Sequence, residues 1–365
     1  MQIHVFIAHM TVGGAERVCV NLCNEFAQRG HEVHLVLLDL DNDVNSHLLD
    51  ERVQIHNLKV HRFRYAAPAM TLYLRKYRPD FMLIFGMEMA VIVNRLRKLK
   101  LTKVKPVVRV LNNVNISLSR EDKVSPVVEN YLKRSQVQMA DMAHIVAQCK
   151  AMGRMIVEKG LVEPDRLSVI YNPVSADLLS KVEKLRQTKS CGDKQITFIG
   201  RVDPQKQPDK LIEAFELIHA KLPEVTLHIV GSGNLIEQTK ELVKNKKLDT
   251  SVVFEGVRKD MENVYAATDL VILSSAYEGM PNALIEAIGC GIPVVSFDCP
   301  IGPSEIIEDG VNGFLAEQDN VEELADKALQ ALKQSWDEDI IRATCKKFDV
   351  KNIAGEYEKI FSELV

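Results

Sequence analysis

Strand-like and helix-like segments alternate along the whole chain, and this alternation constrains the fold more than any other feature. Short apolar runs are separated by amphipathic stretches with helical periodicity. Such alternation is typical of parallel α/β sheets, in which helices connect neighbouring strands. The expected strands are IHVFIA, EVHLVLL, FMLIFG, VVRVL and HIVAQ in the first half, and QITFIG, TLHIVG, SVVFEG, LVILSS and PVVSFD in the second.

The length of the chain and a polar stretch near its middle predict two domains. At 365 residues, each half is long enough to bury its own hydrophobic core. The stretch YNPVSADLLSKVEKLRQTKSCGDK is polar, so we expect the domains to join near residues 174–194. We predict a Rossmann-like domain over residues 1–180 and a second over residues 181–349, facing each other across a cleft.

The stretch SSAYEGMPNALIEAIGCGIPVVS carries the strongest functional signal in the chain. A buried strand leads into a loop with Glu278 and Gly279, and we expect a helix to open at Pro281, where proline costs no hydrogen bond. The glycine lets backbone approach a ligand, and the free amides of a new helix attract anions. A carboxylate there accepts hydrogen bonds from hydroxyls. Hydroxyls together with phosphate indicate a nucleotide sugar, bound at the carboxyl edge of the sheet.

Two further motifs follow strands in the same way. Gly13-Gly14 follows the first strand, and Arg201 and Lys206 follow the strand ITFIG. With the E-x7-E stretch and the subsequent GIPVVSFDCPIGPSEIIEDGVNGFL, they resemble the retaining family-4 glycosyltransferases of GT-B fold in order and rough spacing. The resemblance implies an acceptor-binding first domain and a second domain that binds the nucleotide sugar. It also implies a final helix, over residues 350–365, that crosses back onto the first domain.

The resemblance assigns roles to individual residues. Arg201 and Lys206 would hold the donor diphosphate, where fixed cations stabilise the charge that develops on the leaving group. Glu278 would lie beside the transferred sugar, so these three residues are the expected catalytic set. Glu286 would accept hydrogen bonds from the ribose hydroxyls. The other expected donor-binding residues are Gly13, Gly14, Gly231, Val257 and Arg258, with the backbone amides of Gly279, Met280, Asn282, Ala283 and Leu284.

Each of these motifs also has a purely structural interpretation. Gly13-Gly14 could form a simple tight turn, and Arg201 and Lys206 could be surface cations beside acidic neighbours. Glu286 could lie on a helix surface, but its apolar neighbours indicate burial. Because an unpaired buried carboxylate is costly, we expect Glu286 to bind a ligand.

The chain departs from the family pattern in one place. Many members carry a histidine after the fourth strand of the first domain, where this chain reads VVRVLNNVNIS. Asn112, Asn113 or Asn115 could take over its hydrogen bonding, although an amide is no acid or base near neutral pH. His9, after the first strand, could contact the acceptor or could be a packed strand-end histidine.

The net charge of −4 conceals an asymmetry between the halves. Residues 1–189 contain 28 Lys/Arg against 19 Asp/Glu, and the remainder contains 18 against 31. Residues 59–109 hold 13 basic side chains against Asp80 and Glu88 alone, with apolar residues between them. This region could be a set of solvated helix faces. We expect it to contact an anionic membrane surface, and we expect no nucleic acid because no ladder of stacking aromatics accompanies the charges.

Metal ions and other cofactors are not expected. DLDND, residues 39–43, contains the Asp-x-Asp pattern that binds metal in the other glycosyltransferase fold, but an acidic loop explains it more simply. GSGNLI has Ile236 where the third glycine of a dinucleotide fingerprint should be, so an NAD-dependent enzyme is not expected. The seven cysteines show no CxxC pair and are interpreted as buried, reduced thiols.

The predicted function is therefore a metal-independent, retaining transfer of a hexose or N-acetylhexosamine from a UDP-sugar to a glycan acceptor. The basic surface favours a lipid-linked acceptor in cell-surface polysaccharide assembly, with the enzyme cytoplasmic and peripheral on the inner face of the membrane. A UDP-sugar epimerase of the same fold is an alternative, and it would form product from the donor alone. A non-catalytic scaffold that binds sugar nucleotides is another, although it would not need the complete set of site residues.

Overall fold

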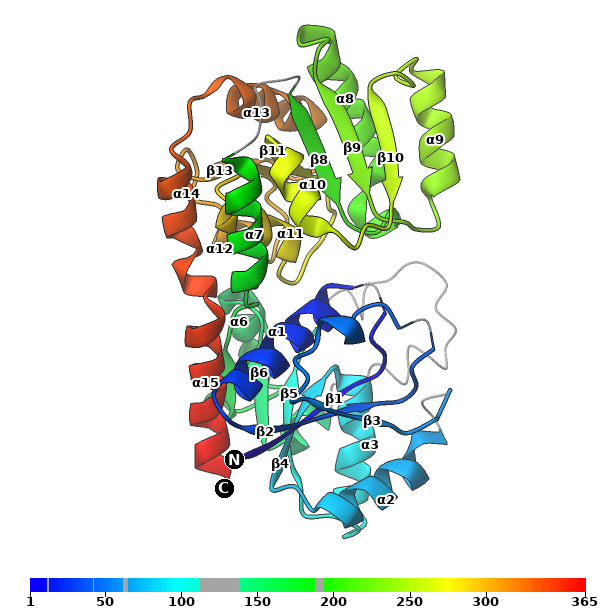
Figure 1. The fold of residues 1–365 in the computed structure, drawn as a ribbon, viewed down its shortest axis with the longest axis vertical. Helices are drawn as coiled ribbons and strands as arrows, with labels where there is room; N and C mark the ends of the chain where they lie inside the picture. Colours follow the sequence, from blue (N-terminus) through cyan, green and yellow to red (C-terminus); the bar gives the residue numbers. More distant parts are fainter. Residues whose placement is uncertain (12, 42, 62–64, 112–137, 188–193) are drawn as a thin grey trace. The chain divides into compact units, whose positions relative to one another are not determined.

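The chain divides into two compact units, which are described separately (Figure 1). The computed structural model describes residues 1–365 except 12, 42, 62–64, 112–137 and 188–193. The first unit contains Met1–Pro173 and Val350–Val365, and the second contains Val174–Asp349. The predicted boundary after residue 180 is too late, because α7 (Ala176–Arg186) is a helix that packs against α10 (Met261–Ala267) within the second unit.

The first unit is built on a parallel sheet with the strand order β3-β2-β1-β4-β5-β6-β7. Most of its central strand residues are buried, as expected for a parallel sheet covered on both faces. Two strands, β3 and β7, were not predicted: β3 is a polar, largely exposed edge strand, and β7 has only three residues. The strands are β1 (Gln2–Ile7), β2 (Glu32–Leu37), β3 (Gln54–Asn57), β4 (Phe81–Phe85), β5 (Lys105–Arg109), β6 (His144–Ala147) and β7 (Leu167–Val169).

The C-terminal helix α15 (Val350–Leu364) belongs to the first unit, where the resemblance placed it. Its Phe361 ring stacks on Phe81 at 4.4 Å between centroids, and Tyr357 packs edge-on against Phe26 of α1. The other helical segments of this unit are α1 (Gly14–Gln28), η1 (Ser46–Leu48), α2 (Ala66–Tyr77), α3 (Met87–Lys98), η3 (Gln138–Asp141), α6 (Lys150–Glu158) and η4 (Pro164–Arg166).

Arg109, the last residue of β5, does not belong to the predicted basic surface. It lies in the basic region 59–109, yet its side chain is fully buried. The guanidinium donates hydrogen bonds to the carbonyl oxygen of Ile170 at 3.1 Å, to the Tyr357 hydroxyl and to the side-chain oxygen of Asn172. Arg109 therefore anchors α15 to the sheet and is not part of a basic surface.

The second unit contains a parallel sheet with the order β10-β9-β8-β11-β12-β13. The short strand β13 was not predicted, because GFLA is too brief to stand out from its surroundings. The strand order reverses between β8 and β11, and ligands of open α/β sheets bind at such a switch point. The strands are β8 (Gln195–Ile199), β9 (Thr226–Val230), β10 (Val252–Gly256), β11 (Leu270–Leu273), β12 (Val294–Phe297) and β13 (Gly313–Ala316).

The two sheets confirm the predicted α/β class with two Rossmann-like units. None of the described helices has the length and hydrophobicity needed to cross a bilayer. The six described cysteines are buried and form no disulfide with one another, as expected for reduced core thiols. The remaining helices of the second unit are η5 (Pro204–Lys206), α8 (Pro208–Lys221), α9 (Ile236–Asn245), α11 (Asn282–Gly289), α12 (Pro303–Ile306), α13 (Val321–Lys333), α14 (Glu338–Thr344) and η6 (Cys345–Phe348).

Candidate functional site

Two loops meet at the carboxyl edge of the second sheet, at the point where the strand order reverses. One follows β8 and the other follows β11, and these strands are neighbours. The amide of Ala276 donates to the carbonyl of Gln205 at 2.9 Å, and the Gln205 side chain donates to the Tyr277 carbonyl at 3.0 Å. The Ser274 hydroxyl donates to the Lys206 carbonyl at 2.7 Å. The loops that carry two separate sequence motifs are therefore fixed to each other.

Lys206 and Glu278 form an ion pair across this junction. Nζ of Lys206 lies 2.5 Å from Oε1 of Glu278, and the side chains are only 13% and 7% exposed. The Ser275 hydroxyl donates to the same carboxylate oxygen at 2.6 Å. Because an ammonium group carries three N–H donors, Lys206 can hold Glu278 and still donate to a bound anion.

Arg201 lies on the same loop as Lys206 but in a different environment. Its side chain is 65% exposed, and its Nη2 lies 3.3 Å from Oδ2 of Asp203 and 3.1 Å from Oε1 of Gln205. Asp203 in turn accepts a hydrogen bond from the Lys206 amide at 3.3 Å, which caps the short helix η5. The guanidinium is thus held loosely at the surface beside an acidic neighbour.

Glu286 is buried in α11, as its apolar neighbours indicated, but it is not unpaired. The hydroxyl of Tyr265, from α10, donates to its Oε2 at 2.6 Å. Both residues are buried, at 7% and 0% exposure. The prediction that Glu286 binds a ligand assumed that its buried carboxylate has no partner in the protein. That assumption was wrong, because the Tyr265 hydroxyl already donates a hydrogen bond to it.

Helix α11 begins one residue later than predicted. Pro281 is the N-cap, and the helix runs from Asn282 to Gly289. The Leu284 amide donates to the Pro281 carbonyl at 3.2 Å. Contrary to the prediction, it is therefore not available to a ligand. The expected residues Gly279, Met280, Asn282 and Ala283 do lie in this turn, directly after Glu278.

Gly231 and Gly233 have a packing role that the sequence did not reveal. A Cβ on Gly231, whose φ is +139°, would lie 1.9 Å from the carbonyl oxygen of Gly200. A Cβ on Gly233 would lie 2.1 Å from the carbonyl oxygen of Val202. Only glycine allows the loop after β9 to come this close to the loop after β8. Gly231 therefore supports the backbone next to Arg201, whatever else it contacts.

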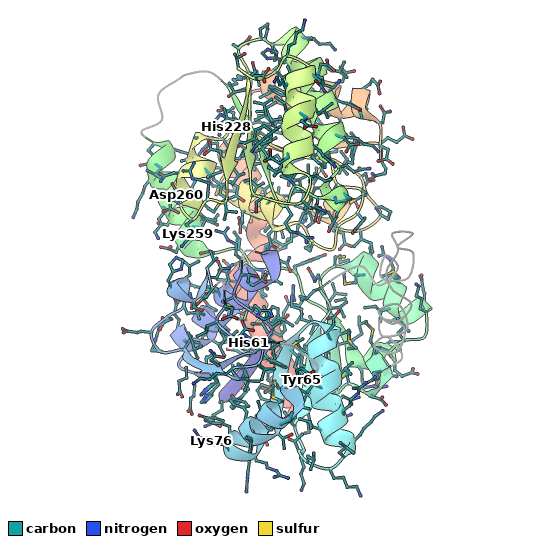
Figure 2. The ribbon with its side chains drawn as sticks, turned by 90° about the vertical axis from the view of Figure 1, so that its right-hand side faces the viewer. His61, Tyr65, Lys76, His228, Lys259 and Asp260 are labelled. Atoms are coloured by element: carbon teal, nitrogen blue, oxygen red, sulfur yellow. The ribbon has the colours of Figure 1, made fainter. Side chains whose placement is uncertain are left out.

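Val257 and Arg258 follow β10, and the arginine is engaged by two carboxylates. Arg258 donates to Asp260 at 2.8 and 2.6 Å and also to Glu255, which accepts from His228 at 2.8 Å. The hydrogen bonds from Arg258 lower the pKa of Asp260, and those from His228 and Arg258 lower the pKa of Glu255. Asp260 and His228 are labelled in Figure 2. Val257 is 44% exposed beside this network.

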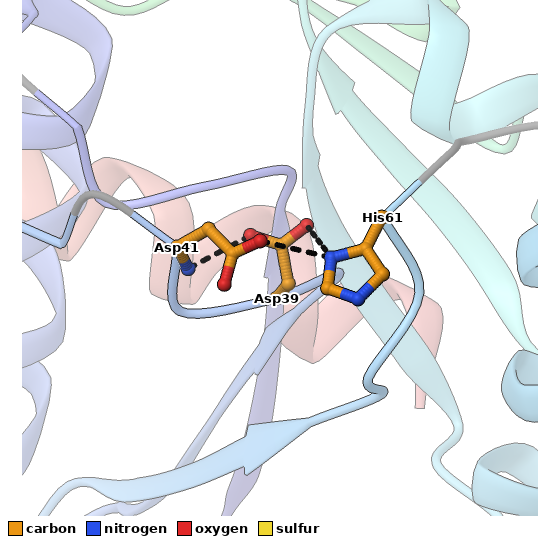
Figure 3. A group of neighbouring side chains, drawn as sticks. All are labelled: Asp39, Asp41 and His61. Atoms are coloured by element: carbon orange, nitrogen blue, oxygen red, sulfur yellow. Dashed lines mark hydrogen bonds and ion pairs between the residues drawn. The ribbon is translucent and has the colours of Figure 1, made fainter.

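In the first unit, Gly13 is the N-cap of α1 and Gly14 is its first residue. Nδ1 of His9 lies 3.1 Å from Oδ1 of Asp39, so the expected loop histidine is paired with the acidic stretch after β2. His61 also approaches this stretch, with Nδ1 2.8 Å from Oδ2 of Asp41 (Figure 3). Sequence analysis did not connect these residues, because they come from three different loops. Asn112, Asn113 and Asn115 lie outside the described residues.

The sequence matches two family profiles that together span most of the chain. "Glycosyltransferase Family 4" matches residues 12–178, and "Glycosyl transferases group 1" matches residues 181–348. An uncharacterised glycosyltransferase of Haemophilus influenzae is 27% identical over 88% of this chain and 87% of its own length. A Campylobacter jejuni relative is 26% identical over 98% of this chain and 95% of its own length. It is named as an N-acetylgalactosamine-N,N'-diacetylbacillosaminyl-diphospho-undecaprenol 4-alpha-N-acetylgalactosaminyltransferase.

The fold is also similar to solved structures. The Anabaena protein HepE, crystallised in complex with UDP and glucose, superposes with a TM-score of 0.80. The alignment covers all of both chains at 21% sequence identity, which supports the fold alone.

Proposed function

The chain belongs to the family-4 glycosyltransferases of GT-B fold, and we propose that it transfers a hexose or N-acetylhexosamine from a UDP-sugar to a glycan acceptor. The observation that carries this proposal is the Lys206–Glu278 pair at the switch point of the second sheet. It puts a cation and a hydroxyl-binding carboxylate side by side where such sheets bind nucleotides.

Lys206 and Arg201 would stabilise the departing UDP. Its diphosphate gains negative charge as the bond to the sugar breaks, and fixed cations lower the energy of that transition state. Lys206 acts as a point charge held by Glu278, whereas the exposed Arg201 can turn from Asp203 to clamp phosphate with two hydrogen bonds. Glu278 would bind hydroxyls of the sugar, and Glu286, oriented by Tyr265, would bind the ribose.

We further propose that transfer proceeds with retention at the anomeric carbon. The acceptor oxygen forms its bond to that carbon on the face from which the diphosphate leaves, and the acceptor proton passes to a diphosphate oxygen. Such a reaction needs positioning and charge stabilisation more than a protein base. Because two cationic side chains serve the diphosphate, the proposed mechanism uses no metal ion.

The acceptor is proposed to be lipid-linked, in the assembly of a bacterial surface glycan. The Campylobacter relative is named for a diphospho-undecaprenol acceptor. In this chain, Tyr65, Leu72 and Leu99 are 60%, 70% and 68% exposed. Tyr65 and Lys76 lie near the two ends of α2 (Figure 2). The exposed basic residues described between residues 59 and 109 are Lys59, Arg75, Lys76, Arg78, Arg95, Lys98, Lys100 and Lys103.

This combination of exposed apolar and basic side chains fits peripheral attachment to the anionic inner face of the cytoplasmic membrane. Co-sedimentation with vesicles tests it. Binding to vesicles with anionic lipid, lost in Leu72→Glu and weakened by salt, is the expected result. If the same amount of protein co-sedimented with purely zwitterionic vesicles, an electrostatic contribution to membrane binding would be contradicted.

Thermal stabilisation by a panel of nucleotides and nucleotide sugars tests the donor assignment. A ligand at 100 times its dissociation constant stabilises the folded state by about 2.7 kcal/mol. We expect UDP and one UDP-sugar to raise the unfolding temperature equally with and without EDTA. Loss of the shift in EDTA would contradict metal independence, and product from the donor alone would favour an epimerase.

A further inference from the structure

The carboxyl edge of the first unit holds an imidazole–carboxylate pair. His9 follows β1 and Asp39 follows β2, and these strands are neighbours with their carboxyl ends at the same edge. Nδ1 of His9 lies 3.1 Å from Oδ1 of Asp39. Asp39 is buried, whereas the His9 side chain is 37% exposed. A buried carboxylate therefore holds an imidazole whose other side reaches solvent.

The loops that carry this pair are fixed to each other. The carbonyl oxygen of Met10 accepts hydrogen bonds from the amides of Val44 at 2.9 Å and Asn45 at 3.1 Å. The amide of Asp41 donates to Oδ1 of Asp39 at 2.9 Å, so the same oxygen serves both the backbone and His9. Nδ1 of His61 lies 4.0 Å from Oδ2 of Asp39, beyond hydrogen-bonding distance, and is closer to Oδ2 of Asp41, at 2.8 Å (Figure 3). The carboxylate is thus locked in place before any ligand binds.

Asp39 also decides which nitrogen of His9 carries the proton. A carboxylate only accepts hydrogen bonds, so Nδ1 of His9 must be the donor in this pair. In the neutral imidazole, Nε2 is then an acceptor. Among the described residues, Asp39 is the one hydrogen-bond partner of His9. The pair therefore presents one oriented acceptor atom at the sheet edge where α/β units bind ligands.

We propose that His9 binds a hydroxyl of the glycan acceptor next to the attacking one through Nε2, and that Asp39 is the positioning residue that sets the tautomer. This inference rests on the proposed function, and it names the group on the first unit that meets the acceptor. The attacking hydroxyl then keeps its own proton directed at the diphosphate oxygen that receives it, while the hydrogen bond to Nε2 holds the acceptor with its attacking oxygen toward the sugar. Orientation of this kind lowers the barrier without the imidazole taking the proton.

The His9–Asp39 pair is tested by steady-state kinetics that measure the release of UDP. The donor is the UDP-sugar identified by thermal stabilisation. The acceptor probe is an octyl glycoside, chosen from those of glucose, galactose, N-acetylglucosamine and N-acetylgalactosamine by turnover with the unmodified enzyme. We expect His9→Ala and Asp39→Ala each to lower kcat/KM for this acceptor about tenfold, the loss of one oriented hydrogen bond. The dissociation constant for UDP should not change in either variant.

Three further variants separate positioning from mere folding. Asp39→Asn should keep near-normal acceptor kinetics, because an amide oxygen at the Oδ1 position can serve both donors. The double variant His9→Ala/Asp39→Ala should be no worse than His9→Ala, since Asp39 acts through His9. His61→Ala, an exposed neighbour, is the control.

Unchanged acceptor kcat/KM in His9→Ala, a variant at a partly exposed position, would overturn the proposal. Additive losses in the double variant would overturn the role of Asp39. Failure of the unmodified enzyme to bind any uridine nucleotide would overturn the proposed function instead.

Discussion

Lys206 and Glu278, 72 positions apart in the chain, form a buried ion pair with 2.5 Å between Nζ and Oε1. The pair joins the loop after β8 to the loop after β11, at the reversal of strand order in the second unit. A buried ion pair and the proposed donor site coincide here, so stability and activity should respond differently to the same substitutions.

Removing one partner of this pair should destabilise the protein strongly. Glu278→Ala leaves the Lys206 ammonium buried without a counter-charge, which typically costs about 3–5 kcal/mol. Urea unfolding monitored by circular dichroism measures the change. The control is Glu237→Ala, which breaks the exposed Lys240–Glu237 pair and should cost about 0–1 kcal/mol. Equal effects of the two substitutions would show that the Lys206–Glu278 pair is solvated.

The double variant Lys206→Met/Glu278→Leu separates the contribution of the pair to stability from its proposed role in sugar transfer. Replacing a buried pair by apolar side chains of similar size is often neutral for stability. We expect its urea midpoint to lie closer to the unmodified protein than that of Glu278→Ala, while sugar transfer is abolished. Retained transfer in this variant would exclude both residues from catalysis.

Tyr265→Phe tests whether the phenol orients Glu286 for the donor. The substitution removes one 2.6 Å hydrogen bond to the carboxylate and leaves the ring packing in place. We expect KM for the UDP-sugar to rise about threefold to tenfold, with a smaller change in kcat, because a net hydrogen bond is worth about 1 kcal/mol. A lower kcat with an unchanged donor KM would place Glu286 at the reacting sugar and not at the ribose.

Gly231→Ala should destabilise the second unit severely. The new methyl group would meet the Gly200 carbonyl oxygen at 1.9 Å, and the φ of +139° is strained for alanine. Gly310→Ala is a matched control, because its φ is +75° but nothing lies within 4 Å of the added Cβ. It should cost about 1 kcal/mol, the penalty for a non-glycine residue in that conformation. Thermal unfolding of both variants measures the difference, and similar midpoints would contradict the close approach of the two loops.

A stack of histidines predicts acid sensitivity of the first unit. His4 and His34 stack at 4.4 Å, His34 contacts His56 at 2.9 Å, and the Tyr73 hydroxyl lies 2.6 Å from Nδ1 of His4. Burial, followed by the charges of His34 and His56, lowers the pKa of His4 to about 3, opposed only weakly by Glu32. Tyr77 of α2 packs against His4 and His56, and the charge of Lys76 also acts on His56.

The folded state therefore resists protonating His4, whereas the unfolded chain binds the proton near pH 6.5. Stability should be fully present above that pH and fall as the pH drops toward 3, by up to about 1.4 kcal/mol per pH unit for this group. Urea midpoints at pH 7 and pH 5 measure the loss. His4→Leu should show a smaller difference between the two pH values, and an identical difference would assign the acid sensitivity elsewhere.

Apolar patterning was sufficient to predict most of the sheet strands, because most residues in the core of a parallel sheet are apolar. Three of the four edge strands, β3, β7 and β13, were not predicted from this pattern. In β3, Gln54 and His56 do not need to be apolar, since one side of the strand faces solvent. The candidate site residues were predicted from their order along the chain. Their partners were not, because Tyr265 reaches Glu286 from a different helix and Asp39 reaches His9 from a different loop. Such pairings depend on strand order, which local sequence does not encode.

Calorimetric titration of UDP into the unmodified protein and into Lys206→Ala tests the central claim most directly. Lys210→Ala is the control, because Lys210 is a nearby lysine that is paired with Asp319 instead. We expect UDP to bind the unmodified protein and Lys210→Ala with similar dissociation constants. Lys206→Ala should bind at least about tenfold more weakly, a loss of about 1.4 kcal/mol. If folded Lys206→Ala bound UDP as tightly as the unmodified protein, the donor diphosphate would not lie at the junction of β8 and β11.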